Sequence, residues 1–302
     1  MRPLKIKSSY EVKISPDGGF CLALGRDVNL WDINVRKKAW KTHPFSHPSH
    51  GDFSPDGSWI AIKSTAGRIL VLDRSNGEII RDFENQSDGE GSNLLFTSCG
   101  KHLIDGSWGG LLTVREVSSG RVLFRQQFSH EMITRIHAGS DTSSWFSEHH
   151  PKWKSDESPI DESYFLRWTG PIENPQPLRL RLTHTSITSS AFSKCGARLA
   201  LVHGYKPAQM VTYDLGTQSA LWSQQVKLGG SGSAMAWSPC GNFLACIQEE
   251  QVAVYDSKSG ALLSVRQLAY PSDVAFSPDG TQIAVGSWQD GFVTNFIPSG
   301  LV

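Results

Sequence analysis

The sequence predicts an all-β fold built from seven repeats of one four-stranded unit. Two observations lead to this prediction: a pentapeptide returns along the chain at a nearly constant step, and each copy lies between two segments of alternating apolar and polar residues. Because successive side chains of a strand point to opposite faces of a sheet, such alternation predicts β-strands.

The repeated pentapeptide is FSPDG, at residues 53–57 and again at residues 276–280, with the near-copies ISPDG, FTSCG, FSKCG and WSPCG elsewhere. The steps between copies are 39, 43, 96, 45 and 39 residues, measured between the terminal glycines Gly18, Gly57, Gly100, Gly196, Gly241 and Gly280. Since the step of 96 residues is about twice the others, one degenerate repeat lies between Gly100 and Gly196. The repeats therefore number seven.

Each copy of the pentapeptide predicts a hairpin that joins the first strand of a repeat to the second. Proline presets φ for a turn, aspartate can bond the backbone beyond it, and glycine adopts positive φ without strain. The first strands are expected to begin near Val12, His50, Asn93, Ile133, Ile187, Ser233 and Asp273.

A third and a fourth strand complete each repeat. The third ends in a large apolar residue that is often followed by aspartate, as in Leu30-Trp31-Asp32 and Val254-Tyr255-Asp256. The fourth leads out of the repeat, as at residues 77–83 and 260–265. Four strands at a step of roughly 40 to 45 residues predict the blade of a β-propeller.

The seventh repeat has no room for a fourth strand between its third strand, near Phe292–Ile297, and Val302. Residues 4–7, an alternating stretch ahead of the first repeat, can supply it and remove an exposed sheet edge. The predicted fold is a seven-bladed β-propeller of four-stranded antiparallel sheets, closed by this N-terminal strand, in a single domain of residues 1–302. Deletion of residues 1 to 8 should destabilise it.

With its SPDG turns and the Trp31-Asp32 dipeptide at the expected offset, the chain resembles the WD-repeat (WD40) family over essentially its whole length. The resemblance implies a buried blade network of a loop histidine, a Ser or Thr, a turn Asp and the Trp. His130 and His184 occupy the histidine position, Asp290 the turn position and Trp31 the tryptophan position, but in different repeats. We therefore expect blade stability to depend on apolar packing between neighbouring sheets.

The fourth repeat is irregular. Its second strand is expected near residues 143–147 and its third near residues 163–168, which leaves an insertion of about residues 148–162. The insertion mixes both charge signs with two prolines and predicts a solvated loop, either functional or merely tolerated.

Composition excludes several classes of protein. The 29 basic and 29 acidic residues give no net charge, so we expect neither a nucleic-acid nor a membrane partner. The N-terminal residues carry charges where a signal peptide needs an apolar stretch, and the five cysteines form no CxxC pair. We therefore expect a cytoplasmic protein with free thiols, monomeric outside its complex.

The sequence contains no P-loop, GxGxxG, HExxH or EF-hand pattern, so we expect no cofactor and no catalytic residue. His43, His47 and His50 lie close together in the sequence and could in principle bind zinc or copper. Two intervening prolines splay these side chains, and an interblade loop with exposed histidines is the alternative. We predict no metal site.

A partner-binding surface is the leading functional prediction. The family topology places the loops from fourth to next first strand and from second to third strand on one face. That face would collect the candidate partner-binding residues Trp108, Trp288, Asp290, Trp153, His43, His47, His50 and Tyr205. Exposed aromatic side chains are frequent in binding hot spots, although packing against a neighbouring blade is the alternative for each tryptophan.

These observations favour a non-enzymatic scaffold that docks a protein or peptide on the loop face. The alternatives are a propeller enzyme of hydrolase or lyase type with its active site at the channel mouth, and a cytoplasmic inhibitor or immunity-type binding protein. A reader of methylated lysine would need an aromatic cage. A phosphoinositide-binding propeller would need a paired-arginine FRRG motif, of which Phe124-Arg125-Gln126-Gln127 lacks the second Arg and the Gly.

Overall fold

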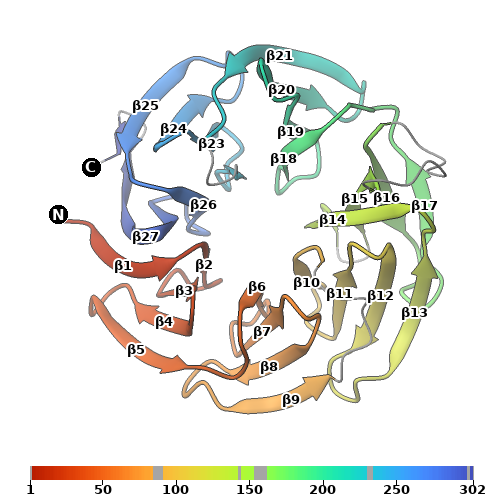
Figure 1. The fold of residues 1–302 in the computed structure, drawn as a ribbon, viewed down its shortest axis with the longest axis vertical. Helices are drawn as coiled ribbons and strands as arrows, with labels where there is room; N and C mark the ends of the chain where they lie inside the picture. Colours follow the sequence, from red (N-terminus) through yellow and green to blue (C-terminus); the bar gives the residue numbers. More distant parts are fainter. Residues whose placement is uncertain are drawn as a thin grey trace. The chain divides into compact units, whose positions relative to one another are not determined.

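The structure is a computed structural model that describes residues 2–83, 91–141, 144–152, 162–229, 234–297 and 300–301. Their regular secondary structure consists of β-strands in seven four-stranded antiparallel sheets (Figure 1). None of these residues belongs to a helix long and apolar enough to cross a membrane. The predicted fold class is confirmed, including the N-terminal strand in the last sheet.

We number the sheets as blades in chain order. Blade 1 consists of β2 (Glu11–Ile14), β3 (Phe20–Leu24), β4 (Val28–Asp32) and β5 (Lys37–Thr42). Blade 2 consists of β6 (Pro48–Phe53), β7 (Trp59–Ser64), β8 (Ile69–Asp73) and β9 (Ile79–Phe83). Blade 3 consists of β10 (Leu94–Phe96), β11 (His102–Gly106), β12 (Leu111–Glu116) and β13 (Val122–Gln127). Blade 4 consists of β14 (Glu131–Ala138), β15 (Trp145–Pro151), β16 (Tyr164–Thr169) and β17 (Gln176–Arg179). Blade 5 consists of β18 (Ile187–Phe192), β19 (Arg198–His203), β20 (Ala208–Asp214) and β21 (Ser219–Val226). Blade 6 consists of β22 (Met235–Trp237), β23 (Phe243–Gln248), β24 (Gln251–Asp256) and β25 (Leu262–Gln267). Blade 7 consists of β26 (Pro271–Phe276), β27 (Gln282–Ile297) and β1 (Leu4–Ser9), and the short strand β28 (Gly300–Leu301) pairs with β27.

The chain forms two compact units. Unit 1 consists of Met1–Pro44 and Ile187–Val302 and contains blades 5, 6, 7 and 1, whereas unit 2, Phe45–Ser186, contains blades 2, 3 and 4. Within each unit the first strands of consecutive blades are neighbours, in the order β18, β22, β26, β2 in unit 1 and β6, β10, β14 in unit 2 (Figure 1).

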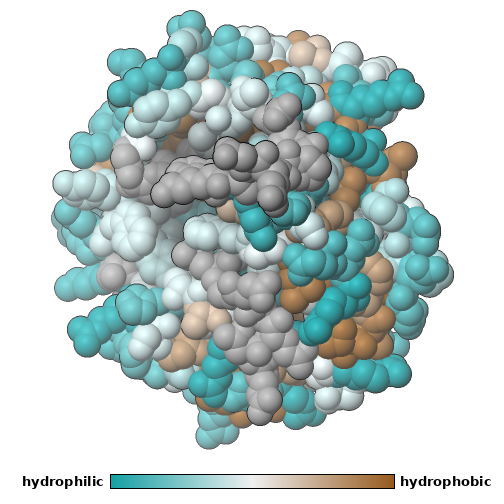
Figure 2. Space-filling view, turned by 45° about the vertical axis from the view of Figure 1, so that its right-hand side comes forward, coloured by the Kyte–Doolittle hydropathy of each residue, from teal (hydrophilic) through white to brown (hydrophobic). Residues whose placement is uncertain are grey.

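Apolar side chains fill the space between neighbouring blades. Buried clusters join blade 5 to 6, 6 to 7 and 7 to 1 in unit 1, and blade 2 to 3 and 3 to 4 in unit 2. The expected packing between sheets is therefore present in each unit. On the face shown in Figure 2, the hydrophobic side chains that remain at the surface lie in several separate groups among hydrophilic ones.

Side-chain hydrogen bonds also link neighbouring blades. In each of these bonds, a side-chain carboxylate or amide oxygen of one blade accepts a hydrogen bond from a backbone N–H in the first strand of the following blade. These bonds run from Val12 N–H to Asp273 Oδ2 (2.9 Å), from Phe96 N–H to Asp52 Oδ2 (2.8 Å) and from Ile136 N–H to Asn93 Oδ1 (2.7 Å).

The N-terminal strand β1 completes blade 7. Leu4 pairs with Val293 and Ile6 with Gly291, both in the second half of β27, while the first half of β27 pairs with β26. Leu4 and Ile6 are buried in the cluster between blades 7 and 1. The strand therefore contributes to sheet pairing and to core packing at once.

The second strand of blade 4 is longer than expected. β15 runs from Trp145 to Pro151, so four residues assigned to the insertion are strand, and two of them, Glu148 and His149, are buried. Residues 153–161 of the insertion lie outside the described residues.

Candidate functional site

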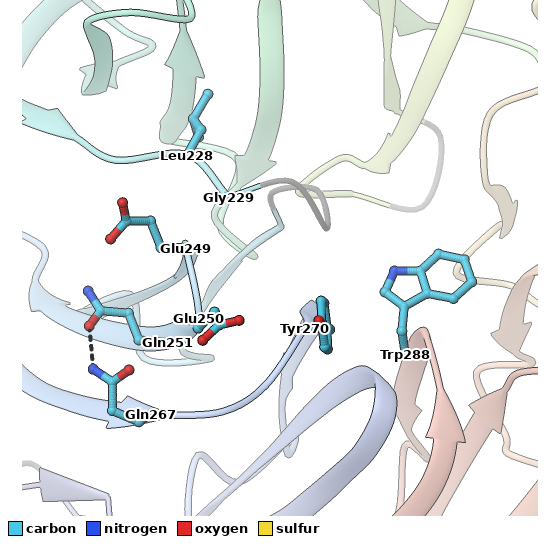
Figure 3. A pocket seen from close by; sticks show the side chains of 8 residues that line it. All are labelled: Leu228, Gly229, Glu249, Glu250, Gln251, Gln267, Tyr270 and Trp288. Atoms are coloured by element: carbon cyan, nitrogen blue, oxygen red, sulfur yellow. Dashed lines mark hydrogen bonds between the residues drawn. The ribbon is translucent and has the colours of Figure 1, made fainter.

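A groove of about 760 Å³ lies on unit 1, at the loop ends of blades 5, 6 and 7 (Figure 3). Its lining combines apolar or aromatic side chains with polar and acidic ones. The lining residues are Leu228, Gly229, Glu249, Glu250, Gln251, Gln267, Tyr270 and Trp288.

Two kinds of loop build the groove. Leu228 and Tyr270 lie in loops that lead from the last strand of one blade to the first strand of the next. Glu249 and Glu250 form the turn between the second and third strands of blade 6, and Trp288 lies in the corresponding part of blade 7. Within unit 1, both kinds of loop therefore emerge on one face, as the family topology implies.

Gly229 and Tyr270 hold these loops close together. A Cβ on Gly229 would lie only 2.7 Å from the Cα of Glu249, so a side chain there would push the two loops apart. The carbonyl of Tyr270 accepts the backbone N–H of Trp288 (3.1 Å), and Tyr270 adopts a φ of 50°. A positive φ is uncommon for a bulky residue and is tolerated where surrounding structure enforces it.

Tyr270 and Trp288 form an aromatic rim on the groove. Their side chains are 49% and 58% exposed. The indole of Trp288 is supported from one side by Tyr10, whose ring centroid is 4.9 Å away in a stacked arrangement. Trp288 is thus supported within the protein, while both side chains of the rim remain open to solvent.

The polar part of the groove is acidic. Gln251 and Gln267 are paired with each other by a hydrogen bond of 2.9 Å, which Figure 3 shows as a dashed line. Glu249 and Glu250 are exposed, and neither carboxylate has a hydrogen bond or ion pair with any residue that the structure describes. The groove therefore offers two carboxylates that are available to a ligand.

Of the predicted binding residues in unit 1, Trp288 lines the groove. Asp290 is exposed and pairs in strand register with Lys7. Tyr205 is 69% exposed, in the turn between β19 and β20, and His43 lies 3.3 Å from Asp27 through its Nδ1 atom. These three residues are not among those that line the groove.

The remaining predicted residues belong to unit 2. Trp108 is 44% exposed in the turn between β11 and β12. His47 is exposed and His50 half-buried at the start of blade 2, and the carbonyl of His47 accepts the backbone N–H of Thr65. His47 has a φ of 54°, so it repeats the backbone arrangement of Tyr270. Trp153 lies outside the described residues.

A buried hydrogen-bond network occupies blade 4. The indole N–H of Trp168 donates to Ser147 Oγ (2.8 Å), which lies 2.8 Å from His149 Nε2. His149 Nδ1 lies 3.1 Å from Glu131 Oε2, and the hydroxyl of Tyr164 donates to the same oxygen (2.7 Å). These bonds join residue types like those of the network that the resemblance implies, but the histidine and the acid lie on strands β15 and β14.

The charges of this network follow from its burial. Burial lowers the pKa of His149, against the opposite effect of its bond to Glu131. Burial would raise the pKa of Glu131, but hydrogen bonds from His149 and Tyr164 leave it below its usual value. A neutral imidazole that donates from Nδ1 to the Glu131 carboxylate and accepts the Ser147 hydroxyl at Nε2 satisfies both groups. Because Ser147 is fully buried and already accepts an indole N–H, this serine is structural.

A second serine, histidine and glutamate lie beside this network. Glu148 Oε1 lies 2.6 Å from His150 Nε2, and His150 Nδ1 lies 3.0 Å from Ser163 Oγ. Glu148 also accepts the hydroxyl of Thr134 (2.7 Å) and contacts Arg135 (3.3 Å). Ser163 is only 1% exposed.

Sequence reasoning missed Tyr270, Glu249, Glu250 and the blade 4 network. A tyrosine before a proline and two glutamates in a turn carry no pattern of their own. Ser147 and His149 do have a signal, because residues two apart on a strand share one face, but an expected strand end at residue 147 places His149 in the insertion. Among the described residues, no group of three or more His, Cys, Asp or Glu side chains could hold a metal ion.

Comparison with known proteins agrees with the fold. The family model "WD domain, G-beta repeat" matches residues 264–294, which include Gln267, Tyr270 and Trp288 of the groove. A solved structure titled "Kuenenia stuttgartiensis Hydrazine Synthase" matches with a TM-score of 0.77 and 12% identity over 96% of each chain, a likeness of fold alone. The family match and the blade architecture together confirm the resemblance that the sequence predicted.

One curated protein has a short similar segment. It is "Tricorn protease homolog 1" of Streptomyces coelicolor (strain ATCC BAA-471 / A3(2) / M145), 37% identical over 59 residues. The matched segment amounts to 20% of this chain and 5% of that protein.

Proposed function

We propose that this WD-repeat-type propeller is a non-enzymatic scaffold that docks a protein or peptide partner in the groove of unit 1. The single observation behind the proposal is the aromatic rim of Tyr270 and Trp288, which is half-exposed at the groove. Aromatic side chains bury a large area with few rotatable bonds, so they dominate many binding interfaces.

The rim is ordered before a partner binds. The stacking of Trp288 on Tyr10 restricts the indole in the free protein, and the backbone bond between Trp288 and Tyr270 restricts the two loops that carry these residues. A partner therefore loses little free energy in ordering them. Leu228 is a further apolar residue that lines the groove.

Affinity capture from the native host tests the proposal. The double variant Tyr270→Ala/Trp288→Ala should lose the partners that the wild-type protein retains, since a hot-spot aromatic contributes on the order of 2 kcal/mol or more. Leu262→Ala, which removes an exposed apolar side chain from the strand β25, is the matched control and should retain them. Retention of every partner by the double variant would overturn the choice of site.

The other predicted residues remain proposed contacts of the same kind. They are His43, Tyr205 and Asp290 in unit 1, and His47, His50, Trp108 and Trp153 in unit 2. Removal of residues 153–161 tests the insertion without cutting into strand β15, whereas removal of 148–162 would delete buried Glu148 and His149. We further propose a cytoplasmic location, in which the five free thiols would stay reduced, and a monomer outside its complex.

A hydrolase is the second candidate, because Ser163, His150 and Glu148 lie in hydrogen-bond order. The curated relative named a protease matches this chain over only 59 residues. The burial of Ser163 places this candidate second. A fluorophosphonate probe should label wild type but not Ser163→Ala if the serine is a nucleophile, and absence of labelling removes the candidate.

A further inference from the structure

The groove of unit 1 carries a charge that narrows the choice of partner. Among the described residues that line it, the charged ones are Glu249 and Glu250. Both carboxylates are exposed and have no described partner, so the groove has a local charge of −2 although the chain as a whole is neutral.

The aromatic rim, like the two carboxylates, favours a positively charged ligand. The faces of Trp and Tyr rings carry partial negative charge and attract cations. Tyr270 and Trp288 are each about half exposed to solvent, and Tyr10 stacks on the ring of Trp288. Glu250 and Tyr270 both line this groove (Figure 3).

We propose that the partner inserts a lysine or arginine side chain of a basic peptide segment into this groove. The ring faces of Tyr270 and Trp288 would hold the apolar stem of this side chain, and the Glu250 carboxylate would pair with its cationic head. Glu249, whose carboxylate points away from both rings in Figure 3, would attract further basic residues of the same segment. This inference rests on the proposed docking function and adds the chemical class of the partner.

Polar neighbours in the groove suit this ligand. Gln267 Nε2 donates a hydrogen bond to Gln251 Oε1, and the Oε1 atom of Gln267 can still accept a hydrogen bond from an ammonium or guanidinium group. An acidic segment would meet two like charges instead. A nucleic acid, whose phosphates are anionic, is disfavoured for the same reason.

Peptide binding measured by fluorescence anisotropy tests the inference. The probes are labelled hexa-arginine, hexa-lysine and hexa-glutamate peptides, and the variants are Glu249→Gln/Glu250→Gln and Trp288→Ala. Hexa-arginine should bind wild type, lose about tenfold in affinity in each variant, and weaken as sodium chloride is raised. The control Glu78→Gln/Glu173→Gln removes two exposed carboxylates of unit 2 and should bind like wild type.

The outcomes are distinguishable. Equal losses in the control, or equal binding of hexa-glutamate, would show non-specific attraction and overturn the inference. Capture of partners that depends on Tyr270 and Trp288 but not on the two glutamates would leave the docking function in place and overturn only the cationic ligand. Loss of capture in both sets of variants, with the control intact, supports both proposals. Unchanged thermal melting of the glutamine variant excludes unfolding as the cause.

Discussion

Trp168 and Trp31 occupy the same position in different blades but have different surroundings. The indole N–H of Trp168 donates to Ser147, whereas that of Trp31 is buried with no hydrogen-bond partner among the described residues. Lys38 lies over the ring of Trp31, with its Nζ atom 5.1 Å from the centroid. The residue pair WD in the sequence therefore does not identify the blade in which the hydrogen-bond network is complete.

His149 gives the stability of the molecule a pH dependence. Its pKa is lowered by burial, so the unfolded chain, in which histidine titrates near pH 6.5, binds the proton more readily than the native protein. The stabilising effect of the neutral imidazole is therefore complete above about pH 6.5 and is lost as the pH falls below it.

We predict that wild type loses roughly 1 kcal/mol more stability than His149→Gln between pH 7 and pH 5. The variant has no group that titrates at this position, so the comparison uses the change in stability with pH and not the stability at one pH. Urea denaturation at constant ionic strength measures the difference. Parallel stability curves for the two proteins would contradict the assignment. Asp273 cannot explain the trend, because burial raises its pKa to about 6 and makes its own contribution run in the opposite direction.

At the scale of the elements, strand β1 shows how alternation sets the role of each side chain. Ile6 is fully buried between blades 7 and 1, while its neighbour Lys5 is exposed on the same strand. The alternation of residues 4–7, read from the sequence, is thus the alternation between core and solvent.

We predict that Ile6→Ala destabilises the protein by about 2–4 kcal/mol, through lost burial and the cavity that remains. Lys5→Ala, which changes an exposed side chain of the same strand, should change stability by less than about 0.5 kcal/mol. Chemical denaturation of both variants makes the comparison. A similar small effect of both substitutions would mean that β1 is not required for the stability of blade 7.

At the scale of the whole molecule, the repeat spacing was sufficient to predict the blades. Proline, aspartate and glycine impose turn geometry locally, so their spacing predicts the hairpins. The expected starts of first strands lie within two residues of the observed ones in all seven blades. The groove could be predicted only in part, as Trp288, because its other members come together through contacts between loops that no local pattern encodes. Trp288 and Tyr270, for instance, meet through a single backbone bond.

The turns between first and second strands repeat one hydrogen-bond pattern. In the turn of blade 2, Ser54 Oγ donates to Asp56 Oδ1 (2.6 Å) and accepts the backbone N–H of Trp59 (2.9 Å). Three other turns have cysteine in place of the aspartate, with the hydroxyl oxygen 3.3–3.4 Å from the sulfur. The pairs are Thr97 with Cys99, Ser193 with Cys195 and Ser238 with Cys240.

This placement predicts two classes of thiol among the five cysteines. The hydrogen bond from Ser193 lowers the pKa of Cys195. At Cys99 and Cys240, burial raises the thiol pKa, but hydrogen bonds from Thr97 and Ser238 and from the backbone outweigh it, so the pKa of each is lowered as well. Burial instead raises the pKa of Cys21, and that of Cys246 to about 12. Because the thiolate is the reactive form, iodoacetamide at neutral pH should label the three turn cysteines at least about tenfold faster than the two buried ones. Mass spectrometry should therefore find three modifications on the native protein and five after denaturation, whereas early labelling of Cys21 or Cys246 would show that the blade cores open readily.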